Sequence, residues 1–574
     1  MFGVGSLRAS LPASPGAIII SEAIHYIGRW HRSRRVMPRL ITDLISRAAY
    51  SEGAGIARAV PEAVAVPRTP DEVVALVRWA AGTRAALIPR GSGSGMAGGA
   101  VGDEIIVDLS RQRDIHAVNA KARSVAVGPG AIRDAVDAAA QRTGLRLPVD
   151  PSSSAFCTIG GMVATNAAGA HTLAYGPMRR WVRALDCVFA DGRRAVVRRG
   201  TPPPTGVPAV NRFLADVEPA IAARSRAVSS AHAGVLKDSS GYALRDFAQS
   251  HELIDLLVGS EGTLALFVGI ELALAPVPSA TSSLLATFTT LERAAAAAAR
   301  ARDAGASACE LLDRTFLDVV AGAGTIRFDD DVEAVLLAEV EGDDASPANA
   351  RARALQRSFE ESGASSVRMA LDIATENDLW SLRHAASPIL NRLDPALKSM
   401  QFIEDGAVPP ERLPEYIRGV RRALDDAGIR GVIFGHAGDA HVHVNPLVDV
   451  RRPDWRARVE RLLDDVVTLT ASLDGTLSGE HGDGRLRTPL LSRVWPAAVL
   501  ELFAQVKNAF DPDNILNPGV KVPVAGQRAL GEIKYDPSLT PLPQPARLAL
   551  DALEREKAYA TSRVDMVSAT HLPD

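Results

Sequence analysis

A six-residue segment, Gly93-Ser94-Gly95-Met96-Ala97-Gly98, reads G-x-G-x-x-G and limits what this part of the chain can form. In a dinucleotide-binding Rossmann unit this pattern joins a strand to a helix, so that a phosphate meets the helix N-terminus. Here the strand-like run Ala85–Pro89 precedes the segment, but a second strand-like run, Glu104–Asp108, follows and leaves no room for a helix. The sequence therefore predicts a glycine-rich turn between two strands. Its backbone N–H groups could cradle phosphates, and a plain flexible hairpin is the alternative.

The bulk properties indicate a folded globular enzyme. The 574 residues predict two or three domains, and 47% hydrophobic and 23% charged residues are a balance typical of globular proteins. A net charge of -3 without a long basic block argues against nucleic-acid binding. Three scattered cysteines, Cys157, Cys187 and Cys309, exclude a disulfide framework and a four-cysteine iron–sulfur cluster. We expect a cytoplasmic protein without a transmembrane segment, and attachment to the membrane surface stays open.

Regular patterns begin near Leu40 and predict an α+β domain. Thr69-Pro70-Asp71-Glu72 is a helix start for residues 71–81, because Thr caps, Pro occupies the first turn and Glu lies three residues after the cap. Another helix is expected near 132–143. Strand-like runs are found at 124–128, 183–190, 254–258 and 264–274.

The sequence pattern changes near residues 276–279. A second region follows, and an Ala-rich helix is expected near its start, at 291–304. We predict four parts: an N-terminal extension (1–39), an α+β domain (40–277), a second domain (278–521) and a polar, Pro-rich tail (522–574) with a charged helix at 546–560. The extension is apolar and then basic. We favour a mis-called start with Met37 as initiator over a targeting segment, because no small-residue cleavage site follows.

Three further segments share the density of small residues found at 89–100, which reads PRGSGSGMAGGA. They are TIGGMVATNAAG (158–169), VGSEGTL (258–264) and DPDNILNPG (511–519). Small residues let backbone approach a flat ligand closely. In this order the four motifs resemble the vanillyl-alcohol oxidase / p-cresol methylhydroxylase superfamily of FAD proteins. Within it, the match is to the group of D-lactate dehydrogenase, D-2-hydroxyglutarate dehydrogenase and glycolate oxidase, over roughly residues 40–521.

The resemblance implies an α+β fold, with a two-lobed FAD-binding domain of the p-cresol methylhydroxylase type and an α/β cap that holds the substrate. It also implies cofactor contacts. The pyrophosphate would be wrapped by Pro89, Arg90, Gly91, Ser92, Gly93, Ser94 and Gly95. The flavin and ribityl chain would be lined by Pro148, Ser152, Thr158, Gly160, Gly161, Thr165, Asn166 and Gly169. Glu261, Gly262 and Thr263 would contact the adenosine side, and Asn517 the isoalloxazine.

Some relatives hold FAD covalently through a histidine, but residues 90–95 contain none. We therefore expect non-covalent FAD. His171, which follows the Asn-rich turn, is interpreted as a surface or structural histidine.

Four of the twelve histidines fall in two late segments, residues 435–445 (GHAGDAHVHVN) and 478–484 (SGEHGDG). Residues two apart in a strand share a face, so His441, His443 and Asn445 would point the same way, with His436 in the preceding turn. Imidazole and carboxylate together suit zinc or manganese. Histidines grouped with a Glu-His pair among glycines predict a functional site.

The resemblance implies roles for these residues. His436, His443 and Glu480 match metal-ligand positions of the D-2-hydroxyglutarate dehydrogenase type, His481 the general base, and Asn445 a substrate contact. His441 departs from the many relatives with Asn there, as either a supporting partner or an added ligand. Arg383, Ser387 and Lys398 match positions that hold a substrate carboxylate, for which an Arg fork is suited. The alternative for this trio is a surface arginine and a solvated lysine.

These implications lead to one expected activity: FAD-dependent oxidation of a small D-2-hydroxy acid to the 2-keto acid by hydride transfer to flavin N5. D-lactate is the first choice, then D-2-hydroxyglutarate or glycolate. Two alternatives stay open, a non-redox flavoenzyme resembling alkyl-glycerone-phosphate synthases and the FAD subunit of a larger iron–sulfur complex. An iron–sulfur protein, a cytochrome or a quinone would accept the electrons. A homodimer is also left open.

Overall fold

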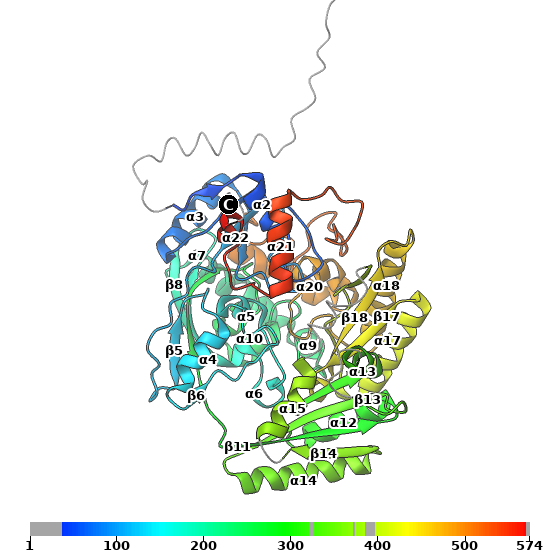
Figure 1. The fold of residues 1–574 in the computed structure, drawn as a ribbon. Helices are drawn as coiled ribbons and strands as arrows, with labels where there is room; N and C mark the ends of the chain where they lie inside the picture. The colour runs from blue at the N-terminus through cyan, green and yellow to red at the C-terminus, as the bar shows by residue number, and fades with distance from the viewer. Residues whose placement is uncertain (1–36, 322–326, 371–372, 385–395, 570–574) are drawn as a thin grey trace, which may run out of the picture.

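The computed structural model describes residues 37–321, 327–370, 373–384 and 396–569. The predicted site residue Ser387 lies outside these ranges. Figure 1 shows helices packed around several sheets, with the N-terminal half on one side and a large sheet from the middle of the chain below and beside it. The fold is mixed α and β, as predicted.

The first sheet explains the position of the glycine-rich segment. Its order is β1 (Leu40–Ile41), β2 (Ala63–Ala65), β4 (Ile105–Asp108), β3 (Leu87–Arg90), and β2, β4 and β3 run parallel. The segment at 91–104 therefore crosses between two adjacent parallel strands, and the hairpin alternative is wrong because a hairpin joins antiparallel strands. Helix α3 (Pro70–Thr83) covers this sheet and begins as predicted, with the Thr69 side chain accepting from the Glu72 N–H at 3.3 Å.

The second sheet is antiparallel, in the order β5 (Ser124–Val127), β9 (Leu266–Ala273), β7 (Val182–Val188), β8 (Arg194–Arg198). The predicted strand at 254–258 is wrong: Leu253–Leu257 form helix α11. A run of five residues, apolar except for Asp255, is too short for its periodicity to separate a buried strand from a buried helical turn. Phe503 and Phe510 of α20 (Ala497–Phe510) pack in this core, so a late segment of the chain returns to the first lobe.

The remaining elements of this lobe are short. They are α2 (Leu44–Ala49), α4 (Arg133–Gln141), β6 (Leu145–Arg146), α5 (Ile159–Thr165), α6 (Thr172–Tyr175), η1 (Met178–Trp181), α7 (Pro208–Arg212), the π-helix η2 (Phe213–Val217), α8 (Glu218–Ala223), α9 (Ser225–Ser230), α10 (Leu244–Ser250) and β10 (Ala275–Pro276).

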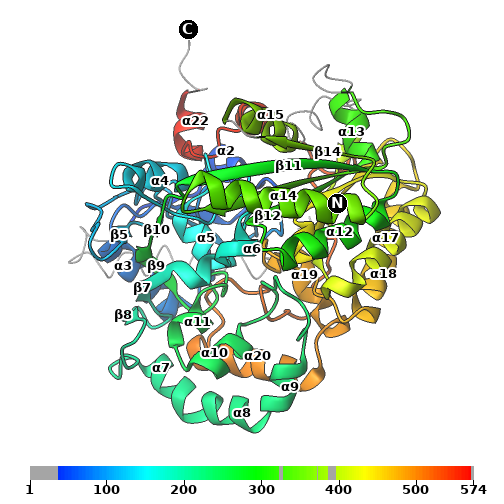
Figure 2. The ribbon, with the colours of Figure 1, turned by 90° about the horizontal axis from the view of Figure 1, so that it is seen from below.

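The third sheet is larger and carries the histidine segment. Its order is β14 (Ser366–Ala370), β11 (Ala280–Phe288), β13 (Ala334–Gly342), β12 (Ala308–Asp313), β17 (Arg430–Gly435), β18 (His441–Asp449), β15 (Leu397–Ser399), and all these pairs are antiparallel. Strand β16 (Gly406–Ala407) also pairs with β18. Figure 2 shows α12 (Leu291–Asp303) and α14 (Ala345–Glu361) lying over this sheet.

Other elements of this region flank the sheet or lead back to the first lobe. They are α13 (Arg314–Ala321), α15 (Ile373–His384), η3 (Pro410–Arg412), α17 (Leu413–Ala427), η4 (Ala437–Asp439), α18 (Trp455–Ser472), α19 (Gly484–Arg487) and η5 (Thr488–Arg493). The tail forms α21 (Gln544–Glu556) and α22 (Arg563–Ala569), which lie beside α2 in Figure 1. Among the described residues, no helix combines the length and apolar character needed to cross a bilayer.

Candidate active site

One cavity of about 1070 Å³ brings together most of the residues predicted from the sequence. Its wall includes these residues of the predicted cofactor set: Pro89, Arg90, Gly91, Ser92, Gly93, Ser94, Gly95, Ser152, Thr158, Gly160, Gly161, Thr165, Glu261 and Gly262. It also includes these of the predicted substrate and metal set: Arg383, Lys398, His436, His443, Asn445, Glu480 and His481. The two sets are separated in sequence by more than one hundred residues, between Gly262 and Arg383, and both face one cavity.

The glycine-rich loop presents backbone donors to this cavity. Among the described residues, the N–H groups of Ser92, Gly93, Ser94 and Gly95 have no hydrogen-bond acceptor. Gly93 has a φ of +75°, and an added Cβ would lie 2.4 Å from the Arg90 guanidinium. The loop is thus a row of free donors that a larger residue at position 93 would disturb, which is the geometry of an anion-binding nest.

Five predicted cofactor residues are absent from the cavity wall: Pro148, Asn166, Gly169, Thr263 and Asn517. The side chains of Asn517 and Asn166 hydrogen-bond to the protein itself. Asn517 Nδ2 donates to the carbonyls of Gly99 (3.1 Å) and Glu261 (2.8 Å), and so ties the C-terminal motif to two of the other motifs. Asn166 ends α5 in the left-handed conformation, and its Oδ1 accepts from the Arg179 N–H.

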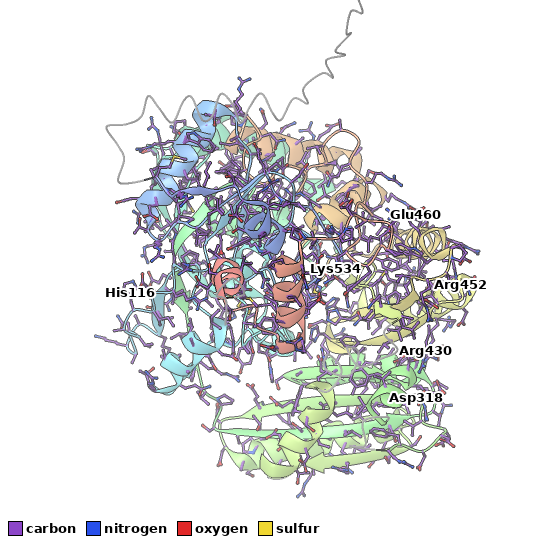
Figure 3. The ribbon with its side chains drawn as sticks, turned by 45° about the horizontal axis from the view of Figure 1, so that its top comes forward. His116, Asp318, Arg430, Arg452, Glu460 and Lys534 are labelled. Carbon is purple, nitrogen blue, oxygen red and sulfur yellow. The ribbon has the colours of Figure 1, made fainter. Side chains whose placement is uncertain are left out.

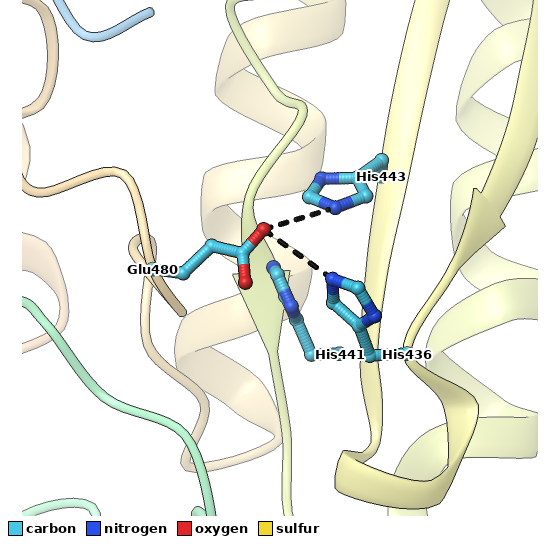
Figure 4. Close-up of side chains that lie close together, drawn as sticks. All are labelled: His436, His441, His443 and Glu480. Atoms are coloured by element: carbon cyan, nitrogen blue, oxygen red, sulfur yellow. Dashed lines mark hydrogen bonds and ion pairs between the residues drawn. The ribbon is translucent and has the colours of Figure 1, made fainter. Parts of the chain in front are cut away.

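His436 and His443 direct the same ring nitrogen toward one carboxylate oxygen (Figure 4). Glu480 Oε1 lies 3.4 Å from His436 Nε2 and 3.3 Å from His443 Nε2. Nδ1 of His436 lies 2.5 Å from Glu310, and Nδ1 of His443 donates to the Glu404 carbonyl at 2.8 Å. A second partner on Nδ1 fixes the tautomer and leaves the Nε2 lone pair for a ligand.

Glu480 is oriented by a buried lysine. Lys237 Nζ donates to Glu480 Oε2 at 3.1 Å, which leaves Oε1 facing the two histidines. Burial raises the pKa of Glu480, but the charges of Lys237 and His436 outweigh it and hold the pKa well below its usual range. Glu480 is therefore a carboxylate in this cluster.

His441 adds a third imidazole. Its Nε2 lies 2.9 Å from Asp405 Oδ1, and its Nδ1 is buried with no partner among the described residues. One ligand atom from each of His436, His441, His443 and Glu480 lies within 4.8 Å of the others. A set of imidazoles and one carboxylate, with an orphaned buried nitrogen beside it, fits a divalent transition-metal ion.

His481 lies at the edge of this cluster and is more accessible than the others, with 27% of its side chain exposed. Its ring stacks on that of His443, with centroids 5.3 Å apart. Burial lowers the pKa of His481, but the carboxylates of Asp405 and Glu404 outweigh it and raise the pKa to about 9. A cation bound at Glu480 would oppose this shift, because a nearby positive charge favours the neutral imidazole.

The predicted carboxylate-binding residues have different surroundings. Arg383 Nε donates to the fully buried Glu310 at 2.6 Å, and its terminal amino groups have no acceptor among the described residues. Its guanidinium lies over the Phe434 ring. Lys398 Nζ lies 5.7 Å from the centroid of the Tyr535 ring. Both line the cavity, so positive charge faces the space next to the histidines.

Sequence reasoning missed the residues that orient the cluster: Lys237, Glu310, Glu404 and Asp405. Asp405 binds His441 and accepts from the backbone N–H groups of Glu480 and His481. None of the four lies in a glycine- or histidine-rich segment. Their role follows from strand pairing and loop packing, which sequence spacing does not reveal.

Two family models match the chain: "FAD binding domain" over residues 61–198 and "FAD linked oxidases, C-terminal domain" over residues 277–520. The chain is 31% identical over 462 residues to D-lactate dehydrogenase of Archaeoglobus fulgidus, which covers 79% of this chain and 90% of that protein. It is 28% identical over 476 residues to glycolate oxidase subunit GlcD of Escherichia coli (strain K12), and this alignment covers 82% of this chain and 86% of that protein. It is 29% identical over 518 residues to D-2-hydroxyglutarate dehydrogenase of Pseudomonas putida, and this alignment covers 84% of this chain and 50% of that protein.

Solved structures share the fold. 4-Ethylphenol oxidase from Gulosibacter chungangensis aligns with a TM-score of 0.64 at 15% identity, over 90% of this chain and 99% of that one. An alkyldihydroxyacetonephosphate synthase aligns with a TM-score of 0.58 at 15% identity, over 89% and 86%. The fold and cavity define a flavoprotein of the p-cresol methylhydroxylase type. The chain belongs to the FAD-linked oxidase family and is an FAD-dependent oxidoreductase.

Proposed function

We propose that this protein oxidises a D-2-hydroxy acid to the 2-keto acid, with D-lactate as the first choice and D-2-hydroxyglutarate or glycolate next. The main support is the shared cavity. The cluster of His436, His443 and Glu480, with His481 beside it, lines the same cavity as the glycine-rich loop. The names of the relatives support the same reaction class.

FAD, when bound, supplies the hydride acceptor, and a divalent ion held by His436, His443 and Glu480 would make the substrate hydroxyl a stronger acid. His481 lies within 3.6 Å of Glu480 and is accessible from the cavity, so it is placed to take the hydroxyl proton. Arg383 and Lys398 supply positive charge for the carboxylate. Asn445 offers its amide from the face of β18 that also carries His443.

A 2-hydroxy acid places two reactive groups on neighbouring carbons. Its carboxylate and hydroxyl are adjacent, so the site must offer cationic groups and a base within a few ångströms of each other. The cavity wall includes both kinds of group: cations from α15 and β15, and imidazoles from β18 and the 478–484 segment. For the electrons we propose a separate acceptor, an iron–sulfur protein, a cytochrome or a quinone.

Anaerobic reduction of the flavin tests this proposal. Purified holoenzyme is mixed with D- and L-lactate, D- and L-2-hydroxyglutarate and glycolate, and loss of the oxidised flavin absorbance is recorded. We expect bleaching by at least one D-2-hydroxy acid or glycolate, and much slower bleaching by the L-enantiomers. Flavin that stays oxidised with every member of the panel contradicts the proposal and favours a non-redox flavoenzyme.

A further inference from the structure

The last part of the described chain contributes to the wall of the central cavity. Residues 544–569 lie beyond the family match that ends at residue 520. Six of them line the cavity: Asp551, Glu554, Arg555, Glu556, Lys557 and Tyr559. A segment outside the matched family region therefore faces the same space as the glycine-rich loop.

Polar contacts connect this segment to the first lobe. Arg547 on α21 lies 3.0 Å from Glu52. Glu554 pairs with the buried Lys534, whose Nζ also donates to the Gly53 carbonyl at 3.3 Å. Figure 3 labels Lys534 beside α21. Glu52 also uses its backbone carbonyl to accept from Arg90, the residue just before the glycine-rich loop. The segment is thus connected to the base of that loop.

Arg563, the first residue of α22, places a buried charge against the loop. Its Nη2 donates to the Ser92 carbonyl at 3.2 Å, and only 4% of the residue is exposed. Its Nε and Nη1 are buried and have no acceptor among the described residues. The Tyr559 ring lies 5.3 Å from its guanidinium and 5.3 Å from the Phe156 ring, both measured to ring centroids. A buried charged donor without an acceptor is costly, so its natural partner is an anion.

Arg90 adds a second buried guanidinium to the same place. Its hydrogen bonds go to backbone carbonyls rather than to a carboxylate. The nearby carboxylate, Asp108, accepts from the Tyr50 hydroxyl and the Ser110 N–H. Burial and the charge of Arg90 lower the pKa of Arg563 to about 9. Positive charge therefore exceeds negative charge behind a loop whose N–H groups are also free.

We propose that residues 544–569 are an intrinsic part of the FAD site, and that Arg563 supplies countercharge for the cofactor diphosphate while it holds Ser92 in place. A dinucleotide diphosphate carries the negative charge that would partner both arginines and the free N–H groups of the loop. This inference rests on FAD binding and not on the identity of the substrate, so failure of the hydroxy-acid proposal leaves it intact.

Release of FAD from diluted holoenzyme, followed as a rise in flavin fluorescence, tests the inference. Arg563 is not part of the cavity wall, so it acts through its charge and through its hydrogen bond to Ser92. Arg563→Gln is therefore expected to raise the Kd for FAD roughly tenfold. Arg563→Lys should lose less affinity for FAD than Arg563→Gln, because lysine keeps the positive charge. Arg528→Gln, whose side chain is 73% exposed, is the matched control and should bind FAD as the wild type does.

Two results would overturn the inference: a Kd for Arg563→Gln within twofold of wild type, or an Arg563→Lys variant as weak as Arg563→Gln. If Arg563→Gln fails to fold, limited trypsin digestion of the wild-type protein decides. Bound FAD should slow cleavage after Arg555 and Lys557 at least tenfold relative to the apoprotein. Equal cleavage rates would show that the segment is not part of the cofactor site.

Discussion

Glu310 accepts a hydrogen bond from Nδ1 of His436 at 2.5 Å, across 126 residues of sequence. The Glu310 side chain is fully buried, and its other oxygen accepts from Arg383. One carboxylate therefore fixes both a proposed metal ligand and a proposed carboxylate-binding residue. Burial raises the pKa of Glu310, but its interactions with His436 and Arg383, which both donate hydrogen bonds to it, outweigh burial and hold the pKa well below its usual range.

Glu310→Gln is expected to weaken binding of zinc or manganese by about ten- to a hundredfold, because an amide holds the His436 tautomer less firmly. Competition with a chromophoric chelator measures the affinity. Glu361→Gln, at a side chain that is 74% exposed, is the control. An unchanged affinity in a folded Glu310→Gln variant would show that this contact does not organise a metal site.

His481→Gln should lower kcat by at least about a hundredfold, since a general base contributes roughly 10²–10⁴ in rate. FAD content and metal content should stay at wild-type levels, because no metal-ligand position is changed. His116→Gln is the control at an exposed histidine on the edge of the molecule in Figure 3. A variant that keeps its kcat would assign the base to another residue.

Removal of divalent ions should abolish activity and leave the flavin spectrum intact, because the His436, His443 and Glu480 cluster is separate from the glycine-rich loop. Dialysis against a chelator, then addition of zinc or manganese, measures loss and recovery. Metal analysis that finds no divalent ion, together with full activity after chelation, would leave only direct base catalysis by the histidines.

Arg383→Ala should raise KM for the hydroxy acid and lower kcat/KM by roughly ten- to a hundredfold, with little change in FAD content. Part of the loss reflects the buried Glu310, which loses the Arg383 guanidinium and keeps only His436 as a hydrogen-bond partner. Arg383→Lys should recover some of the activity because it restores charge without the planar fork. The control is Arg430→Ala, whose side chain is 58% exposed and which Figure 3 labels on the surface. Unchanged kcat/KM would place Arg383 outside substrate binding.

His171 joins the two lobes and makes stability depend on pH. Its Nδ1 lies 2.6 Å from Asp150, and its Nε2 lies 2.9 Å from Glu339 on β13. Burial lowers the pKa of His171, but Asp150 and Glu339 outweigh it and hold the pKa well above its usual range. Glu341 and Arg133 are the other charged groups nearby.

Because the folded pKa of His171 is raised, its stabilisation is complete below the unfolded value of about 6.5 and is lost as pH rises through the folded value. The Tm of wild type should therefore fall relative to that of His171→Gln as pH rises through this range. Thermal denaturation of both proteins across neutral and alkaline pH measures the difference. Parallel curves would mean that the His171 contacts do not stabilise the folded protein.

The parts of the molecule that depend on local backbone rules could be predicted from the residue order. The glycine-rich turn between strands, the capped start of α3 and the histidine strand β18 follow from residue types at fixed spacing, because steric limits and capping act over a few residues. The strand predicted at 254–258 was wrong because that run is too short to show a period, and most of it lies in α11.

Which side chains surround the site became clear only from the three-dimensional fold. Glu310, Asp405 and Lys237 reach the histidines from separate strands and loops, and Arg563 reaches Ser92 across 471 residues. No fixed spacing in the sequence predicts these contacts, because each depends on how sheets pair and pack over long separations. The local motifs therefore specified what the cavity could bind, whereas long-range packing fixed the charges and tautomers that surround it.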